Sequence, residues 1–318
     1  MKETAPNASI VIPVYNDPQG VTDTLSSILE NTGGEPEIIV VDNNSTDETA
    51  EVIREYAGRY EHVQLRFERD VQSSYAARNT GIEHATGDVI VFLDADQSVP
   101  KYWLTDILKE HRRRDAHYLA PDVRLVVPPN VTLAGQYNYH TGFPIAEFIR
   151  LQGFAPTACL CVTRSLLENV GGFDERLVSG GDKEFGNRVS NAGYELHYTP
   201  DVVIHHPVRN NLNSLVKRNL RIGRGHCQLQ RYYPNRYGRV GIPPRPSGIH
   251  SDQIGTRNGT EKSTDEFDDR SSKKSTGTLG ISRRVLLSVV AFTMTVTRGV
   301  GYYSECMRVL WDRISGDR

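Results

Sequence analysis

The sequence predicts an α/β protein with a mostly parallel, Rossmann-like sheet that is covered by helices on both faces. Short apolar runs alternate with segments of helical period through the first hundred residues. Parallel neighbours in a sheet need crossover connections, which helices supply. Each apolar run also ends in polar or acidic side chains, and ligands of such sheets bind beyond the carboxyl ends of the strands. We therefore expect a ligand crevice at one edge of the sheet.

The first two strands and helices carry boundary signals. The run IVIPVY predicts a buried strand, after which Asp17 and Pro18 offer an N-cap and a first-turn proline to a helix. The run IIVV predicts the second strand. The spacing from Ser45 to Glu48 matches a capping box, so we expect Ser45 to cap the second helix.

The later elements follow from the same patterns. The stretch 131–151 fits neither a helix nor a strand pattern, and residues 234–280 are rich in Pro, Gly, Ser, Thr and charged side chains. Such a composition buries too little apolar area to offset its ordering entropy. We therefore expect one α/β domain over 1–231, a flexible linker over 232–280 and an amphipathic C-terminal helix over 281–318. The other expected elements are strands at 63–68, 88–93, 118–127, 158–163 and 195–206, and helices at 73–85, 102–114, 182–192 and 212–231.

Composition limits the class of protein. Hydrophobic residues make up 38% and charged residues 24% of the 318-residue chain, which is ordinary for a globular protein. The formal net charge of −2 gives no general attraction to nucleic acid, so we expect no nucleic-acid partner. The four cysteines form no CxxC pair, and the first ten residues lack the apolar core of a signal peptide. We therefore expect a cytoplasmic protein.

Two carboxylates follow the apolar run VIVFL directly, in the sequence Asp94-Ala95-Asp96. One interpretation is that both side chains cap the next turn. The other is that they bind Mg²⁺ or Mn²⁺ and leave coordination positions open for phosphate oxygens. Like charges at the mouth of an apolar core repel each other, and a bound cation relieves that repulsion.

Other polar residues at expected element ends also have a structural and a functional interpretation. Asp42 closes a turn or accepts from a nucleotide base or ribose, and Arg78 is solvated or aimed at a ligand. Asp182 is a helix N-cap or a general base, and the two glycines before it leave the approach open. The pair His205 and His206 ends an apolar strand and is structural unless a metal site lies nearby.

Taken together, the motifs resemble the inverting family-2 glycosyltransferases with the GT-A fold. The matching segments are IVIPVYND, VVDNNSTDET, AARNTGIEHATGDVIVFLDAD, GGFDERLVSGGDKEFGNRVSNAG and the histidine after the last strand, and they cover about residues 8–206 in family order. The resemblance implies transfer of a sugar from a nucleotide-diphosphate donor to a hydroxyl of a glycan or lipid-linked acceptor. It also implies inversion of the anomeric carbon, dependence on Mg²⁺ or Mn²⁺, and a place in cell-surface glycan or protein glycosylation.

The resemblance implies donor-binding roles for residues near the first strands. Asp42 would contact the nucleotide base, and Pro13 and Tyr15 would line the same pocket. Asn44 and Arg78 would contribute to donor binding beside them.

The metal and acceptor roles fall on later residues. Asp94 would contact the ribose or the water shell of the metal, and Asp96 would ligate the cation that bridges the diphosphate. His205 or His206 would be the third contact to the metal or the pyrophosphate. Asp182 would deprotonate the acceptor hydroxyl. The family more often has Glu-Asp at that point, whereas this chain has Gly-Asp, which puts the fine positioning of the acceptor in question.

The helix 212–231 and the C-terminal helix both separate basic from apolar side chains. In the C-terminal helix only 13 uncharged residues lie between Arg284 and Arg298, fewer than the ~20 that span a bilayer, so we expect it to lie in the membrane interface. A span from Val285 to Ser304 and packing on the α/β domain are the alternatives. The protein would then be peripheral on the inner face of the cell membrane. The basic stripe expected near lipid headgroups is Lys217, Arg218, Arg221 and Arg224.

Two other functions compete with glycan transfer. One is a synthase that charges a polyprenyl phosphate with a single sugar, and the other is a non-catalytic nucleotide-sugar-binding protein. The presence of Asp182 argues against the second. A dinucleotide-dependent oxidoreductase would carry GxGxxG after the first strand, where this chain has PVYNDPQG.

Overall fold

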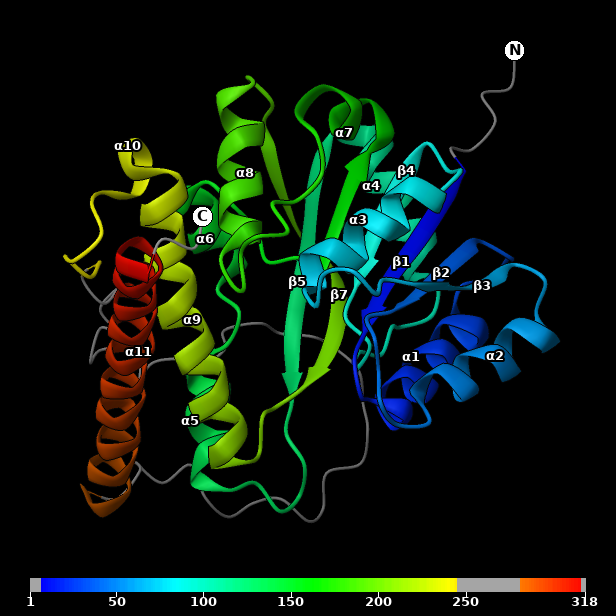
Figure 1. Ribbon diagram of the computed structural model, residues 1–318. Coiled ribbons are helices and arrows are strands. Elements are labelled where there is room, and N and C mark those ends of the chain that lie inside the picture. Colours follow the sequence, from blue (N-terminus) through cyan, green and yellow to red (C-terminus); the bar gives the residue numbers. More distant parts are fainter. Residues whose placement is uncertain (1–6, 245–280, 316–318) are drawn as a thin grey trace.

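The computed structural model describes residues 7–244 and 281–315, so most of the expected linker lies outside the described residues (Figure 1). Across the described ranges, seven strands form one mostly parallel sheet in the order β3-β2-β1-β4-β6-β5-β7. The exception is β6, which runs antiparallel to both of its neighbours. The strands are β1 (Ala8–Val14), β2 (Glu37–Asp42), β3 (Val63–Phe67), β4 (Val89–Leu93), β5 (Tyr118–Val126), β6 (Cys159–Thr163) and β7 (Leu196–Pro207).

Helices surround this sheet, and the α/β fold class expected from the sequence is confirmed (Figure 1). The helices are α1 (Pro18–Asn31), α2 (Thr49–Arg59), α3 (Ser74–His84), α4 (Trp103–Arg114), α5 (Leu133–Thr141), α6 (Ile145–Gln152), α7 (Arg164–Val170), α8 (Gly181–Asn191), α9 (Leu212–Tyr232), α10 (Pro234–Tyr237) and α11 (Ile281–Ser315).

The core lies between the sheet and these helices. All residues of β1 and β4 are buried, as continuous apolar runs in a sheet covered on both faces should be. Helix α3 approaches β1 closely at Gly81, where an added Cβ would overlap the side chain of Val11. The Asp17 side chain accepts from the Gly20 N–H at 2.9 Å, so the expected N-cap of α1 is present.

Several local expectations were wrong. Ser45 does not begin α2, which starts at Thr49. Instead the Ser45 hydroxyl accepts from the Asn16 N–H at 2.9 Å and joins the loops after β1 and β2. The stretch 131–151 contains α5 and most of α6, and α7 was not anticipated. The helical period is weak in α5 because two of its four buried positions, Gly135 and Asn138, carry no apolar side chain, whereas Leu133 and Tyr139 are exposed.

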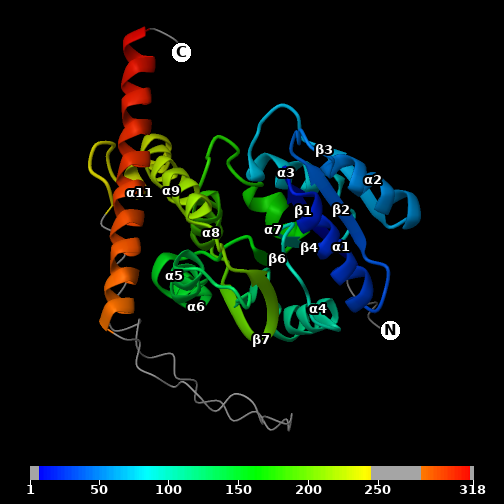
Figure 2. The ribbon, with the colours of Figure 1, turned by 90° about the horizontal axis from the view of Figure 1, so that it is seen from below.

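Helices α9 and α11 pack side by side on the outer side of the α/β domain (Figures 1 and 2). A Cβ at Gly223 of α9 would overlap the backbone of α11, and one at Gly301 of α11 would overlap the backbone of α9. These two glycines therefore permit a close crossing of the helices. The Sγ atoms of Cys227 and Cys306 lie 3.1 Å apart at the same interface.

Candidate active site

The loop after β4 is held by the end of β7. The backbones of Ser98 and His205 exchange two hydrogen bonds, of 3.0 and 2.9 Å, in an isolated antiparallel bridge. Within the loop, the Asp94 N–H donates to Oε1 of Gln97 at 3.0 Å. Successive side chains of a strand point to opposite faces, so the side chains of His205 and His206 lie on opposite faces of β7. The bridge thereby brings the β4 loop beside His206.

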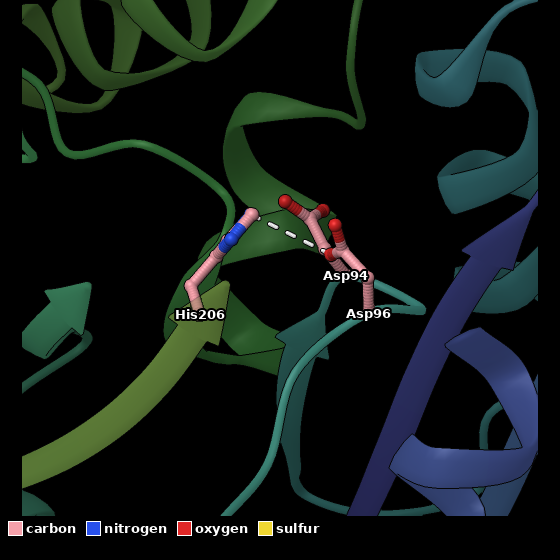
Figure 3. Close-up of side chains that lie close together, drawn as sticks. All are labelled: Asp94, Asp96 and His206. Carbon is pink, nitrogen blue, oxygen red and sulfur yellow. Dashed lines mark ion pairs between the residues drawn. The ribbon is translucent and has the colours of Figure 1, made fainter. Parts of the chain in front are cut away.

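Asp94, Asp96 and His206 form a group whose potential ligand atoms lie within 4.8 Å of one another (Figure 3). The His206 Nε2 is 3.5 Å from the Asp96 Oδ1. The His206 Nδ1 is 2.8 Å from the Pro207 carbonyl oxygen, so this ring nitrogen carries the proton that it donates. That tautomer leaves the Nε2 lone pair directed at the carboxylates, which is the arrangement of a metal-ligating histidine. His205 is not a member of the group.

Burial and charge both act on the two carboxylates. Burial raises the pKa of Asp96, and the nearby Asp94 charge raises it further, whereas His206 and Arg209 act in the opposite direction. Asp94 forms a 2.8 Å ion pair with Arg78, whose side chain is only 5% exposed. Of the ion pairs between described residues, Arg78 pairs with Asp94, and the partner of Asp96 is His206. A divalent cation held by two carboxylate oxygens and one imidazole nitrogen would supply the missing positive charge, and this donor set suits Mg²⁺ or Mn²⁺.

A pocket of about 510 Å³ lies between the end of β1, the start of α3 and the middle of α9. The metal group does not line it, but Arg78 connects the two, since it pairs with Asp94 and donates to the carbonyl of the lining residue Ser74. Pro13 and Tyr15 line it, as expected for donor-binding residues, and Tyr15 is 50% exposed. Three basic residues expected to face lipid headgroups line the pocket instead. This happens because α9 packs across the carboxyl ends of the strands, so one of its faces closes the crevice. The three are Lys217, Arg221 and Arg224.

Asp42 lies at the end of β2 and is buried. Its Oδ2 accepts from the Ser45 N–H at 3.2 Å, while its buried Oδ1 has no hydrogen-bond partner among the described residues. Its neighbour Asn43 lines the pocket. Asn44 is exposed and adopts a positive φ of 62°, which turns the chain toward the loop after β1. A buried carboxylate oxygen with an open acceptor position is suited to an N–H or O–H donor on a ligand.

Asp182 lies in the first turn of α8, and the expectation that it caps this helix was wrong. The N-cap is Gly180, whose φ of 85° disfavours any residue with a side chain. At Gly181 an added Cβ would overlap the Tyr75 ring, so this glycine lets α8 approach α3. Burial raises the pKa of Asp182, and the Arg78 and Arg221 charges partly offset this. Arg78, which pairs with Asp94, thus also acts on Asp182, and one arginine links the two acidic parts of the site.

Two contributors were missed by the sequence analysis. Gln97 fixes the β4 loop through its contact with Asp94, and Arg209 acts on Asp96 from the segment that joins β7 to α9. A single arginine in a connecting segment has no periodic signal. Its position shortly after His205 and His206 was the only signal in the sequence that could have pointed to Arg209.

Comparisons with known proteins agree with this geometry. The family Glycosyl transferase family 2 matches residues 9–167, and Glycosyl transferase family group 2 matches 89–311. The chain is 34% identical over 231 residues to glycosyltransferase AglE of Haloferax volcanii, which covers 72% of this chain and 76% of AglE. It is 26% identical over 248 residues to the pre-mycofactocin glycosyltransferase of Mycobacterium tuberculosis, which covers 72% of this chain and 49% of that relative.

Solved structures share the fold. The mannosyltransferase PcManGT from Pyrobaculum calidifontis, in complex with GDP-Man and Mn²⁺, aligns with a TM-score of 0.57 at 23% identity, over 76% of this chain and 67% of that one. S. aureus TarS 1–349 in complex with UDP-GlcNAc aligns with a TM-score of 0.52 at 17% identity, over 72% and 74%.

Proposed function

The chain belongs to glycosyl transferase family 2, and on that premise we propose which residues carry out sugar transfer from a nucleotide-sugar donor. The metal group would be Asp94, Asp96 and His206, and the donor would occupy the pocket that Pro13 and Tyr15 line. Asp182 would act as the general base, and the anomeric carbon would be inverted. The observation that carries this proposal is the cluster of two carboxylates and one correctly oriented imidazole, which Arg78 connects to a basic pocket.

A divalent ion bound at this group would neutralise the negative charge of the departing nucleoside diphosphate. Contacts within the protein orient the residues that would bind this ion. His206 presents Nε2 because its Nδ1–H is taken by the Pro207 carbonyl, and Arg78 holds Asp94 in place at 2.8 Å. PcManGT, which shares the fold, was solved with GDP-Man and Mn²⁺, and this supports a cation in the same kind of site.

The donor pocket provides contacts for each part of a nucleotide. Tyr15 offers a half-exposed ring for the base. Asp42 is buried and outside the pocket lining, next to the lining residue Asn43, and its unpartnered Oδ1 would accept from a base N–H or a ribose hydroxyl that reaches it. Lys217, Arg221 and Arg224 line the opposite wall and would attract the phosphates. Arg78 and Asn44 lie outside the pocket lining. In this proposal Arg78 orients Asp94, and Asn44 shapes the loop after β2.

Asp182 has the features of a general base. Its carboxylate is partly buried and its pKa is raised, which brings it closer to the operating pH of an enzyme. The acceptor hydroxyl would lose its proton to Asp182 as its oxygen attacks the anomeric carbon from the face opposite the diphosphate. The C–O bond to the diphosphate then breaks, and this geometry inverts the configuration.

The test is a donor screen in Mn²⁺ or EDTA. We expect slow hydrolysis of at least one of the UDP-, GDP- or dTDP-sugars, only with the metal present. Asp96→Ala should abolish it and weaken binding of the matching nucleoside diphosphate by about 10-fold or more, since a charge-assisted contact contributes about 1.5–3 kcal/mol. Asp106→Asn, an exposed carboxylate on α4, is the control. Equal affinity of Asp96→Ala and wild type, with and without EDTA, would remove Asp96 from the site.

We also propose that α11 attaches the enzyme to a membrane surface, next to a lipid-linked acceptor. The helix is long and apolar enough to cross a membrane by length and composition alone, over Val285–Trp311. Its exposed side chains from Val285 to Met307 are all uncharged, over about 33 Å of helix. The hydroxyls of Thr293, Thr295 and Thr297 donate to carbonyls one turn back, so they need no water.

Packing on α9 favours an interfacial position over a span. Arg298 donates to Asn219 Oδ1 at 2.9 Å, and Glu305 accepts from Gln228 at 3.1 Å, so the charged side of α11 is held against the α/β domain. A helix fixed in this way cannot be surrounded by lipid unless α9, which carries several basic residues, enters the membrane as well. The uncharged side would lie in the interface.

Vesicle flotation tests this attachment. We expect the wild type to float with vesicles of mixed neutral and anionic lipid, and Phe292→Asp with Val300→Asp to remain at the bottom. Phe292 is 70% exposed, and the control pair Tyr60→Asp with Leu151→Asp replaces exposed apolar residues outside α11, Leu151 being 65% exposed. Equal flotation of the α11 double variant and the wild type would show that α11 is not the attachment site.

A further inference from the structure

Four arginines gather where α9, α11 and the segment after β7 meet. Arg218 and Arg221 lie on α9, Arg298 lies on α11, and Arg209 precedes α9. The charges of the other three all act on Arg218. Only Arg221 lines the donor pocket, and Arg209 acts on the Asp96 carboxylate. The cluster therefore extends from the metal group to α11, behind the wall of the donor pocket.

The packing of three helices fixes this cluster. Residues of α5, α9 and α11 form one small apolar core that includes Tyr137, Leu215 and Met294. One turn further along α9, the Asn219 carboxamide accepts from Arg298 at 2.9 Å and donates to the Met294 Sδ at 3.2 Å. Arg209 is anchored through its N–H, which donates to the Asn138 Oδ1 at 2.7 Å, beside Tyr137.

The cluster forms no ion pair in the part of the chain that the structure describes, although the Arg209 charge acts on Asp96 and the Arg221 charge acts on Asp182. None of the ion pairs between described residues includes any of its four arginines. Asn219, which contacts Arg298, is neutral, and the buried Nε of Arg298 lacks a hydrogen-bond partner in that same part. Burial, followed by repulsion from Arg209, Arg221 and Arg298, lowers the pKa of Arg218 to about 10. Guanidiniums kept together at this energetic disadvantage indicate a site for an anion.

We propose that Arg209, Arg218 and Arg298 bind the phosphate of a lipid-phosphate acceptor. This inference rests on the proposed function and specifies the acceptor of the same active site. Planar guanidiniums bind phosphate oxygens in pairs, and three of them around one phosphate neutralise its charge. The cluster reaches Asp96 at one end, which places the phosphate close to the reacting atoms. A polyprenyl phosphate, or a lipid phosphate bearing a short glycan, fits this position.

The location favours the acceptor over the donor diphosphate. The donor pocket has its own basic residues, Lys217, Arg221 and Arg224, on one face of α9. Arg218 does not line that pocket, and around the helix it is about 100° from Lys217 and about 60° from Arg221. Arg298 comes from α11, whose uncharged exposed face is the one we assign to the membrane. A phosphate bound here would therefore have its lipid chain on the membrane side.

The experiment measures ligand binding to the full-length protein by calorimetry and thermal melting. Inorganic phosphate, farnesyl phosphate and farnesol are titrated in the presence of Mn²⁺ and a saturating nucleoside diphosphate. We expect wild type to bind both phosphates, farnesyl phosphate more tightly, and to ignore farnesol. Arg218→Gln should weaken phosphate binding by about 10–100-fold, which corresponds to about 1.5–3 kcal/mol for a contact to a charged group. Nucleoside diphosphate binding should not change.

The melting temperature provides a second readout. Without phosphate, Arg218→Gln should melt at the wild-type temperature or above it, because the substitution removes a repelled charge. Phosphate should raise the melting temperature of the wild type and of Arg218→Lys more than that of Arg218→Gln. Arg112→Gln, at an exposed arginine on α4, is the matched control.

The outcomes distinguish this inference from the proposed function. If Arg218→Gln weakens nucleoside diphosphate binding as much as phosphate binding, the arginines serve the donor diphosphate and the inference is wrong. It is equally wrong if wild type binds neither phosphate while it still hydrolyses the donor in Mn²⁺. Loss of donor hydrolysis and of nucleoside diphosphate binding in wild type would instead contradict the proposed function.

Discussion

At the scale of single residues, the site depends on side chains that hold one another. His206 presents one nitrogen to the aspartates because the Pro207 carbonyl takes the proton of the other. Arg78 pairs with Asp94 and also acts on the partly buried Asp182. Gln97 fixes the loop that carries both aspartates. Substitution of one of these residues should therefore affect more than one step of the reaction.

Replacement of Asp182 by Asn tests the general base. The amide fits the same space but cannot take a proton, so sugar transfer should fall by roughly 10²–10⁴-fold while nucleoside diphosphate affinity stays the same. In the wild type, kcat/KM should fall as the pH drops through the pKa of Asp182. Because burial raises this pKa above its usual 3.8, the acid limb should lie above that value.

The pH profile separates a catalytic from a structural role. Residual transfer by Asp182→Asn should no longer follow the acid limb, and Asp106→Asn should keep the wild-type profile. Near-normal turnover of Asp182→Asn, or an unchanged acid limb, would leave Asp182 with a structural role in α8 only.

At the scale of elements, α9 is the centre of the arrangement. One face of α9 closes the donor pocket with Lys217, Arg221 and Arg224, and another packs against α11 through Gly223. The proposed donor pocket, the arginine cluster and α11 are therefore all supported by α9. A shift of α11 should therefore displace the α9 residues that line the active site.

Replacement of Gly301 by Val should separate α11 from α9. An added Cβ there would overlap the backbone of Leu220, whereas one at Gly299 meets nothing within 4 Å, so Gly299→Val is the control. Overpacking of this kind destabilises by about 1–3 kcal/mol. The distance between Cys227 and Cys306 provides the readout, because their Sγ atoms lie 3.1 Å apart.

The measurement is oxidation by copper phenanthroline, followed by alkylation and mass spectrometry under non-reducing conditions. Wild type and Gly299→Val should form the Cys227–Cys306 disulfide at similar rates, and Gly301→Val more slowly. If Gly301→Val is oxidised as fast as the control, the close crossing of the two helices is not needed to hold α11.

At the scale of the whole molecule, residues far apart in the chain form one site. The pocket joins the end of β1, the start of α3 and the middle of α9, so a bound donor contacts both halves of the domain. Helix α11 packs on α9 and belongs to the same unit, on the side that we propose faces the lipid. We therefore expect donor binding to stabilise the domain as a whole.

Thermal melting checks this coupling. At 100 times its Kd, a nucleoside diphosphate with Mn²⁺ should add about 2.7 kcal/mol to the free energy of unfolding and raise the melting temperature by roughly 5–10 °C. EDTA should remove most of this shift. The nucleoside without phosphates is the control and should raise it far less. A full shift in EDTA would show that binding does not depend on the metal.

The sequence by itself determined the fold class and indicated Asp94, Asp96 and the histidine pair as candidate metal ligands. Apolar period, strand-end acids and the order of the motifs are local signals, so β4, Asp94, Asp96 and the nearby histidines could be found without a structure. The N-cap of α1 was found for the same reason, since Asp17 contacts an N–H only three residues away.

Other features were decided only by the tertiary structure. The choice of His206 over His205 follows from the pairing of β7 with the β4 loop, and Ser45 serves a loop from another strand rather than its own helix. The basic face of α9 looked like a membrane stripe because a helical wheel gives the face but not its partner. Contacts between residues far apart in the chain leave no trace in local spacing, and those contacts turn this face toward the donor pocket.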